Sequence, residues 1–159
     1  ISSTSDCSSC LMPETLLHVV AGCKTYLEQG RFTWRHNSVL CFLARHLPIT
    51  SNSTLYVDLP GFTSPSVITG EYLRPDLLLA IPKKCLYILE LTVGFESNLN
   101  NNVVRKNRKY AELVNKHSDQ FKNVKFINLS VSTLGSFVTY VKQIRYGSKT
   151  TKIRNQENN

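Results

Sequence analysis

Residues 74–93 read RPDLLLAIPKKCLYILELTV, and this stretch indicates the fold more clearly than any other part of the chain. It contains two apolar runs, at 77–81 and 86–93, separated by the tripeptide Pro-Lys-Lys at 82–84. Short apolar runs joined by a polar turn are typical of a β-hairpin. The stretch therefore predicts two neighbouring antiparallel strands.

This hairpin carries two acidic residues, Asp76 just before the first apolar run and Glu90 within the second. If the turn is centred on Lys83, the two acids face each other across the ladder, with side chains about 5 Å apart. Carboxylates that close repel each other unless a cation lies between them. A hard divalent ion such as Mg²⁺ or Mn²⁺ prefers oxygen ligands and can activate a water for attack on a phosphodiester.

A simpler interpretation of the two acids is structural. Asp76 follows Pro75 and could belong to a turn, while Glu90 could be a rim residue paired with Lys83 or Lys84. Against this, Glu90 is embedded in the apolar segment LYILELTV, where a lone buried charge is costly. The residues alone leave both interpretations open.

A basic stretch at 105–117, RKNRKYAELVNKH, predicts a helix that begins at residue 103. Successive helical residues turn by about 100°, which places Lys106 at the edge of the inward apolar stripe and Lys109 one step further out. A cation at that edge could reach the two carboxylates, so Lys106 is the first candidate and Lys109 the second. The residues expected to contact nucleic-acid phosphates are Arg105, Arg108, Lys122 and Lys125.

Hydrophobic periodicity predicts the remaining elements. Residues 32–47 have apolar side chains at helical intervals and stop at a proline, which predicts a helix. Residues 50–70 are rich in Ser, Thr, Pro and Gly, so we expect a linker with one edge strand at 55–59. The further expected elements are a polar capping turn at 97–102, a strand at 124–131 and a last helix at 134–144. This order predicts a small α/β sheet flanked by helices.

The first 23 residues contain a separate signal, the pattern C-x2-C-x7-H-x4-C. Zinc prefers sulfur and imidazole ligands in a tetrahedral set, and four protein ligands make such a site structural. The pattern therefore predicts a zinc knuckle, which can bind nucleic acid or be purely structural. Its ligands would be Cys7, Cys10, His18 and Cys23. The other Cys and His residues are interpreted as isolated or core residues, namely His36, Cys41, His46, Cys85 and His117.

The chain is basic, with 19 Lys and Arg against 11 Asp and Glu and a formal net charge of +8 over 159 residues. Such an excess favours an anionic partner, either nucleic acid or an acidic membrane surface. No apolar run approaches the roughly 18 residues needed to cross a bilayer, and the start lacks the layout of a signal peptide. We expect no membrane partner. Because the sequence begins with Ile1, we also expect it to be part of a longer protein.

Three blocks, RPDLLL, ELTVGFE and RKNRKY, resemble the restriction-like endonuclease at the C-terminus of site-specific non-LTR retrotransposon polyproteins. The upstream blocks CSSC, ETLLHVVAGC and GRFTWRHNSVL resemble the zinc knuckle and linker that precede it. The resemblance covers roughly residues 7–140. It implies the PD-(D/E)xK fold, a restriction-endonuclease-like mixed β-sheet flanked by helices, and an enzyme that nicks target DNA to prime reverse transcription.

By this resemblance, Asp76 and Glu90 are the metal-binding acids and the lysine comes from the following helix, because Thr92 stands where the wider group has its lysine. Glu96 matches a further acid that could orient Lys106 or bind metal. Arg74 matches a basic residue before the first acid, and Tyr110 an aromatic after the basic helix. The chain departs from the family at two places. Gly94 stands where the family usually has proline, and the segment SVSTLGSF corresponds to a more glycine-rich segment in the family.

We therefore expect a nuclear, Mg²⁺-dependent DNA endonuclease that also binds Zn²⁺, is fused to a reverse transcriptase and could contact element RNA. The alternative is a catalytically inactive nucleic-acid-binding module that uses the knuckle and the basic helix. A zinc-stabilised protein-interaction domain would leave the charge excess unexplained. The expected segments are the knuckle at 1–30, helix and linker at 31–70, endonuclease core at 71–146 and a disordered tail at 147–159.

Overall fold

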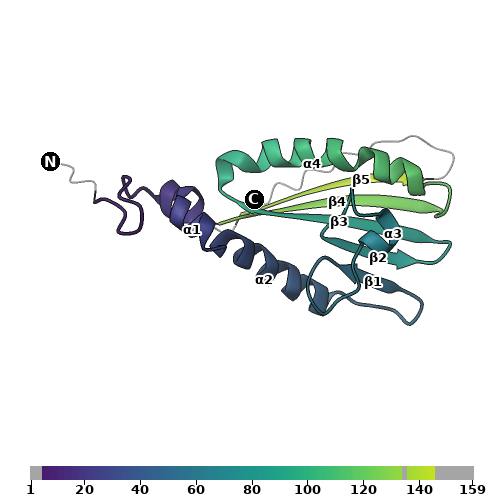
Figure 1. Ribbon diagram of the computed structural model, residues 1–159. Coiled ribbons are helices and arrows are strands. Elements are labelled where there is room, and N and C mark those ends of the chain that lie inside the picture. Colours follow the sequence, from purple (N-terminus) through teal and green to yellow (C-terminus); the bar gives the residue numbers. More distant parts are fainter. Residues whose placement is uncertain (1–4, 134–135, 146–159) are drawn as a thin grey trace.

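The structure, a computed structural model, describes residues 5–133 and 136–145, and within them all side chains except those at 96–98, 137–138 and 140–145. The molecule is mixed α/β, with helices flanking a mixed sheet and a cluster of Cys and His residues near the N-terminus. Figure 1 shows that the N-terminal segment projects from one end of the sheet.

Five strands form the sheet in the order β1-β2-β3-β4-β5. Their bounds are β1 (Thr54–Val57), β2 (Leu77–Ile81), β3 (Cys85–Gly94), β4 (Asn123–Ser132) and β5 (Phe137–Arg145). Neighbours are antiparallel except for β3 and β4, which are parallel. Parallel neighbours need a crossover connection, and helix α4 (Glu96–His117) provides it.

The other helices lie before β1 or within the linker. They are η1 (His18–Gly22), a single turn of π-helix, then α1 (Lys24–Glu28), α2 (Arg31–His46) and α3 (Ser66–Thr69). The bounds of α2 agree with the expected helix to within one residue at each end. Among the described helices, none is long and apolar enough to span a membrane.

The predicted hairpin is confirmed, and its register is the one expected from a turn centred on Lys83. Leu77 pairs with Leu89 and Ile81 pairs with Cys85. Lys83 has a φ of 57°, in the left-handed region, and so lets the chain reverse within three residues. Continuing this register by one residue places Asp76 opposite Glu90 at the end of the ladder.

Two apolar cores lie on opposite faces of the sheet because side chains alternate along each strand. On one face, α4 buries Tyr110 against Phe126, with ring centroids 5.5 Å apart. On the other face, α2 buries Leu40 and Ala44 against Leu91. Figure 1 shows these two helices on either side of the strands. Glu90 lies on the α4 face of β3, so this helix can supply a further group beside the acid pair.

Two expected elements were wrong. The polar segment 97–102 forms the first turns of α4 rather than a capping turn, because Leu99 and Val103 are buried at helical spacing and extend the inward stripe. Packing of such a stripe outweighs the low helix propensity of the asparagines. The helix expected at 134–144 is instead strand β5, since its β-branched and aromatic residues pair along the outer edge of β4.

The outcomes for the linker, for the strand after α4 and for the C-terminal tail are as follows. Strand β1 confirms the expected edge strand, while the short helix α3 had no sequence signal that we recognised. The strand expected at 124–131 is confirmed as β4. The tail expected to be disordered, 147–159, lies outside the described residues.

Candidate functional site

The four predicted zinc ligands come together near the N-terminus. One potential ligand atom from each of Cys7, Cys10, His18 and Cys23 lies within 4.8 Å of the others. Sγ of Cys10 is 3.1 Å from Nε2 of His18 and 3.8 Å from Sγ of Cys23. The group could hold a metal ion such as zinc, because its three sulfurs and one imidazole are the ligands that zinc prefers.

Local backbone geometry brings these ligands together. The backbone N–H of Cys7 donates to Met12 (2.8 Å), and Leu11 donates back to Cys7 (2.8 Å), which closes a tight loop around Cys10. Hydrogen bonding, first from the backbone of Ser9 and then from the side chain of His18, lowers the pKa of the Cys7 thiol to about 6. The thiolate is the form that binds a metal.

The second candidate site lies where β2 begins, beside the middle of β3, and there Asp76 and Glu90 meet. The backbone N–H of Asp76 lies 3.4 Å from Oε2 of Glu90, and the backbone N–H of Leu91 donates to Oδ2 of Asp76 (2.7 Å). Glu90 is only 2% exposed, whereas the Asp76 side chain is 16% exposed. The Glu90 carboxylate is therefore buried, whereas the Asp76 carboxylate can reach solvent.

Lys106 of α4 completes this second site. Its ammonium group is ion-paired with Oε1 of Glu90. Lys109 instead donates to the hydroxyl of Tyr110 (3.0 Å), which in turn donates to the carbonyl of Arg74 (3.0 Å). Of the two lysines considered from the sequence, Lys106 is thus the one that reaches a carboxylate.

The electrostatics of Glu90 are unfavourable for its charged form. Burial, followed by the charge of Asp76, raises the pKa of Glu90, although Lys106 opposes this effect. Burial and the charge of Glu90 also raise the pKa of Tyr110, which keeps its phenol protonated. The Lys106 ammonium pairs with Glu90, while Asp76 adds a second negative charge beside it, and a further cation at this place would relieve the repulsion between the two carboxylates.

Buried polar groups continue from Glu90 across the α4 face of the sheet. Asn128 lies beside Glu90 in the β3–β4 register, and Ser130 lies beside Thr92. The Ser130 hydroxyl donates to Oδ1 of Asn128 (2.9 Å). Nδ2 of Asn128 and Oγ1 of Thr92 are buried without a hydrogen-bond partner among the described residues. Such atoms usually bind ordered water.

His36 belongs to the same site and was missed from the sequence. Its Nε2 lies 3.4 Å from Oδ2 of Asp76, and this hydrogen bond raises the pKa of His36. The residue comes from α2, which packs on the opposite face of the sheet. Its spacing from Leu40 and Ala44 (i, i+4, i+8) was visible in the sequence, but nothing in the sequence indicated that this stripe ends beside Asp76.

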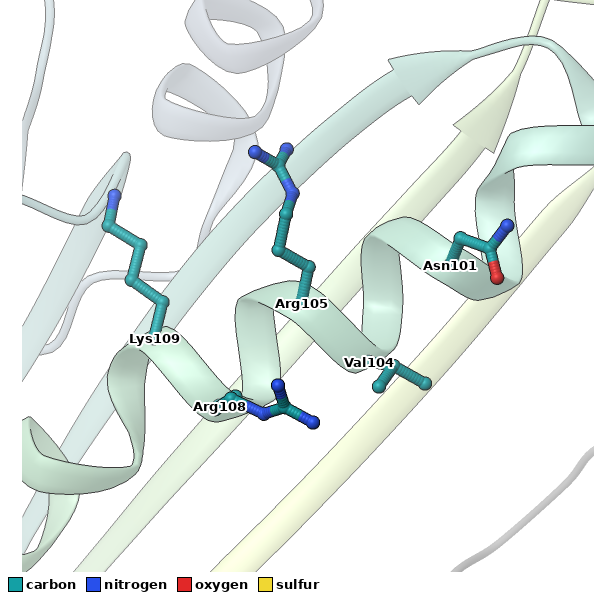
Figure 2. Close-up of a pocket in the computed structure, with 5 residues that line it drawn as sticks. All are labelled: Asn101, Val104, Arg105, Arg108 and Lys109. Atoms are coloured by element: carbon teal, nitrogen blue, oxygen red, sulfur yellow. The ribbon is translucent and has the colours of Figure 1, made fainter.

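The basic residues considered as phosphate contacts are distributed over several places. Arg105, Arg108 and Lys109 line an open pocket of about 420 Å³ along α4, together with Asn101 and Val104. Figure 2 shows the Lys109 and Arg105 side chains projecting from the same side of the helix, with Arg108 on another side.

The remaining candidates make other contacts, are exposed, or have side chains that the structure does not describe. Arg74 is ion-paired with Asp58 (3.0 Å) and with Glu71 (3.7 Å). Lys125 lies 5.4 Å from the centre of the Tyr87 ring, on the sheet face opposite Glu90. Lys122 is exposed before β4. Glu96 begins α4, but its side chain is outside the described residues.

Comparison with known proteins does not identify the chain, because no protein-family model and no curated protein matches its sequence.

Proposed function

We propose that this chain is a divalent-cation-dependent DNA endonuclease domain with a restriction-endonuclease-like core. The observation that carries the proposal is the meeting of Asp76, Glu90 and Lys106 beside the start of β2. Two acids that can hold a cation, with a lysine beside them, are groups that can support metal-assisted hydrolysis of a phosphodiester.

The burial of these charges argues against a purely structural ion pair. Glu90 is almost completely buried, and its pairing with Lys106 requires both groups to lose water. Ion pairs in such positions seldom stabilise a fold more than apolar residues of similar size. A second carboxylate, Asp76, then adds repulsion that Lys106 and the nearby His36 offset only in part, since the pKa of Glu90 is still raised. Buried charges whose electrostatic interactions are unfavourable, and whose pKa values are shifted as a result, are typical of functional sites.

Each residue has a distinct role in this proposal. Asp76 and Glu90 would hold Mg²⁺ or Mn²⁺, which would supply an activated water and offset the charge of the phosphate. Lys106 balances the charge of Glu90 before the cation binds. Beside a phosphate, the Lys106 ammonium would also stabilise the negative charge that develops on it.

Affinity for DNA would come from the basic surface of α4. Arg105 and Arg108 line an open pocket and make no ion pair among the described residues. Phosphate contacts of this kind give affinity and orientation but no choice of sequence. The formal net charge of +8 agrees with a polyanionic partner.

The sequence resemblance to non-LTR retrotransposon endonucleases supplies the setting. In that setting, the domain nicks one strand of target DNA in the nucleus, next to a reverse transcriptase and element RNA. The N-terminal cluster then holds Zn²⁺ as a structural knuckle. The mixed sheet flanked by helices is compatible with this group of nucleases.

A second candidate function is nucleic-acid binding without catalysis. It is favoured by one observation, the direct pairing of Lys106 with Glu90, which already neutralises one of the two acids. In that case, the Cys/His cluster and the arginines of α4 would contact the nucleic acid.

A plasmid-nicking assay separates the two functions. The zinc-loaded chain is incubated with supercoiled plasmid and Mg²⁺ or Mn²⁺, and binding is followed in parallel by a gel-shift assay. We expect cation-dependent nicking that is lost in Glu90→Gln and Lys106→Ala but largely kept in Lys109→Ala. The control is Glu112→Gln, which changes an exposed acid of α4. Binding without nicking by the wild-type chain would overturn the endonuclease proposal in favour of the second function.

A further inference from the structure

We infer that His36 is a positioning residue that holds the Asp76 carboxylate in the orientation needed for cation binding. This inference rests on the proposed cation site and assigns a residue from the opposite side of the sheet to it. The inference adds a residue that the sequence analysis interpreted as isolated, since only acids and lysines were predicted for this site.

The contacts of Asp76 are concentrated on one of its two carboxylate oxygens. Oδ2 accepts the backbone N–H of Leu91 at 2.7 Å, and Nε2 of His36 lies 3.4 Å from the same oxygen. Within the described part of the chain, no hydrogen bond or ion pair reaches Oδ1 of Asp76. Oδ1 is therefore available to bind a ligand, while the two contacts on Oδ2 fix the plane of the Asp76 carboxylate.

Asp76 needs such a support because it lies just outside the regular ladder. Strand β2 begins one residue later, at Leu77. The backbone of Asp76 is held, since its N–H approaches Glu90 and its carbonyl accepts the N–H of Asp58 (2.9 Å). Backbone contacts leave the side-chain torsions free, so two contacts on Oδ2 are what select one rotamer.

The position of His36 is in turn set by the core. His36, Leu40 and Ala44 follow one another at intervals of four residues and so lie along one stripe of α2. Leu40 and Ala44 are buried against the sheet, which anchors the helix and brings the imidazole to the end of β2. The His36 side chain is 27% exposed. Its ring is thus held by packing on one side without being enclosed.

Direct ligation of the cation by His36 fits the geometry less well. Its Nε2, the atom nearest the acids, is within hydrogen-bond distance of Oδ2 of Asp76. In the described residues, His36, Asp76 and Glu90 do not form a metal-ligand group, whereas the N-terminal Cys/His residues do. A histidine behind a carboxylate ligand orients that ligand, and such supporting partners strongly affect metal affinity.

The test compares two polar substitutions that differ in reach. In His36→Gln, the amide nitrogen can occupy the place of Nε2 and donate to Oδ2 of Asp76. In His36→Asn, the shorter side chain ends near the place of Nδ1 and cannot make this contact. Both variants remove the ring, so any general effect of losing the imidazole on α2 packing is shared between them.

The readout is the dissociation constant of Mn²⁺, measured on the zinc-loaded, full 159-residue chain by the electron paramagnetic resonance signal of free Mn²⁺. We expect His36→Asn to weaken Mn²⁺ binding about tenfold or more, and His36→Gln to restore most of the affinity. His46→Asn is the control, because His46 lies on the same helix, is exposed and bonds only locally to the carbonyl of Phe42 (2.8 Å).

The outcomes separate this inference from the proposed function. Equal Mn²⁺ affinity in wild type and His36→Asn, or equal losses in the Asn and Gln variants, would overturn the positioning role and leave the endonuclease proposal intact. If the folded wild-type chain binds no Mn²⁺ at all, the cation site itself is refuted, and the role of His36 with it. Melting temperatures of all variants show whether each protein is folded.

Discussion

Lys106 of α4 is ion-paired with Glu90 of β3, a residue that is almost completely buried beneath the helix. The pair links the crossover helix to the strand on which it packs, and it does so next to a second carboxylate, that of Asp76. An ammonium group in this place partly balances two acids. The stability and the proposed chemistry of the site therefore both depend on Lys106.

Replacing Lys106 by alanine should destabilise the fold. The change leaves the buried Glu90 without its counter-charge, and the expected loss in unfolding free energy is about 3 kcal/mol. Urea denaturation at neutral pH measures it. Lys116→Ala, at an exposed position of the same helix, should change stability by less than about 0.5 kcal/mol. The double variant Lys106→Met with Glu90→Gln should recover part of the loss, and a further loss would contradict this explanation.

The stability of the chain should fall as pH rises above the normal range for a glutamate. The folded protein holds the Glu90 proton more tightly than the unfolded chain, because burial and then Asp76 raise the pKa of Glu90 above 4.5. Folding therefore binds protons in this window, and unfolding free energy decreases with increasing pH. Urea midpoints of wild type and Glu90→Gln, measured from pH 4.5 upward without added Mg²⁺, test this. Parallel profiles for the two proteins would show that Glu90 does not cause the slope.

Removal of one predicted zinc ligand should abolish metal binding at the N-terminal cluster. Cys23→Ser takes away a buried sulfur ligand, and tetrahedral zinc sites lose most of their affinity with one ligand missing. Elemental analysis of the purified chain should then find zinc in wild type and little in the variant. The control is Cys41→Ser, at a position on α2 outside the cluster. Equal zinc content in Cys23→Ser and wild type would refute the assignment.

Loss of the arginines on α4 should weaken DNA binding in a salt-dependent way. Arg105→Gln with Arg108→Gln removes two charges from the open pocket on that helix. If both contact phosphates, the slope of log K against log salt should decrease in magnitude by about 0.9 for each lost contact. Fluorescence anisotropy with a labelled duplex measures it at several salt concentrations. The control is Arg45→Gln on α2, which should leave the slope of log K against log salt unchanged. An unchanged slope in the double variant would exclude the pocket as a DNA contact.

Local patterns were sufficient to predict the centre of the fold. The two apolar runs around Lys83 predicted the hairpin and its register, and that register placed Asp76 opposite Glu90. Helical periodicity then placed Lys106 nearer to the acids than Lys109. These relations depend on residues close in sequence or on a regular period, which is why the sequence alone was informative.

The parts that were wrong or missed depend on long-range packing. The polar segment 97–102 is helical because Leu99 lies on the buried side of α4. The segment after β4 is a strand because the edge of β4 was free to pair with it. His36 reaches Asp76 only because α2 packs across the far face of the sheet. No periodicity within a single segment contains that information.

The central claim is that Asp76 holds a cation for DNA cleavage, and the nicking rate of Asp76→Asn tests it most directly. Asparagine keeps the size of the side chain but removes the charge that a divalent ion requires. The matched control is Asp58→Asn, because Asp58 is a neighbouring carboxylate that pairs with Arg74 rather than with the site. We predict that Asp76→Asn nicks supercoiled plasmid at least about 100-fold more slowly than wild type in Mg²⁺ or Mn²⁺, while Asp58→Asn remains active. Nicking by Asp76→Asn at the wild-type rate would contradict the claim.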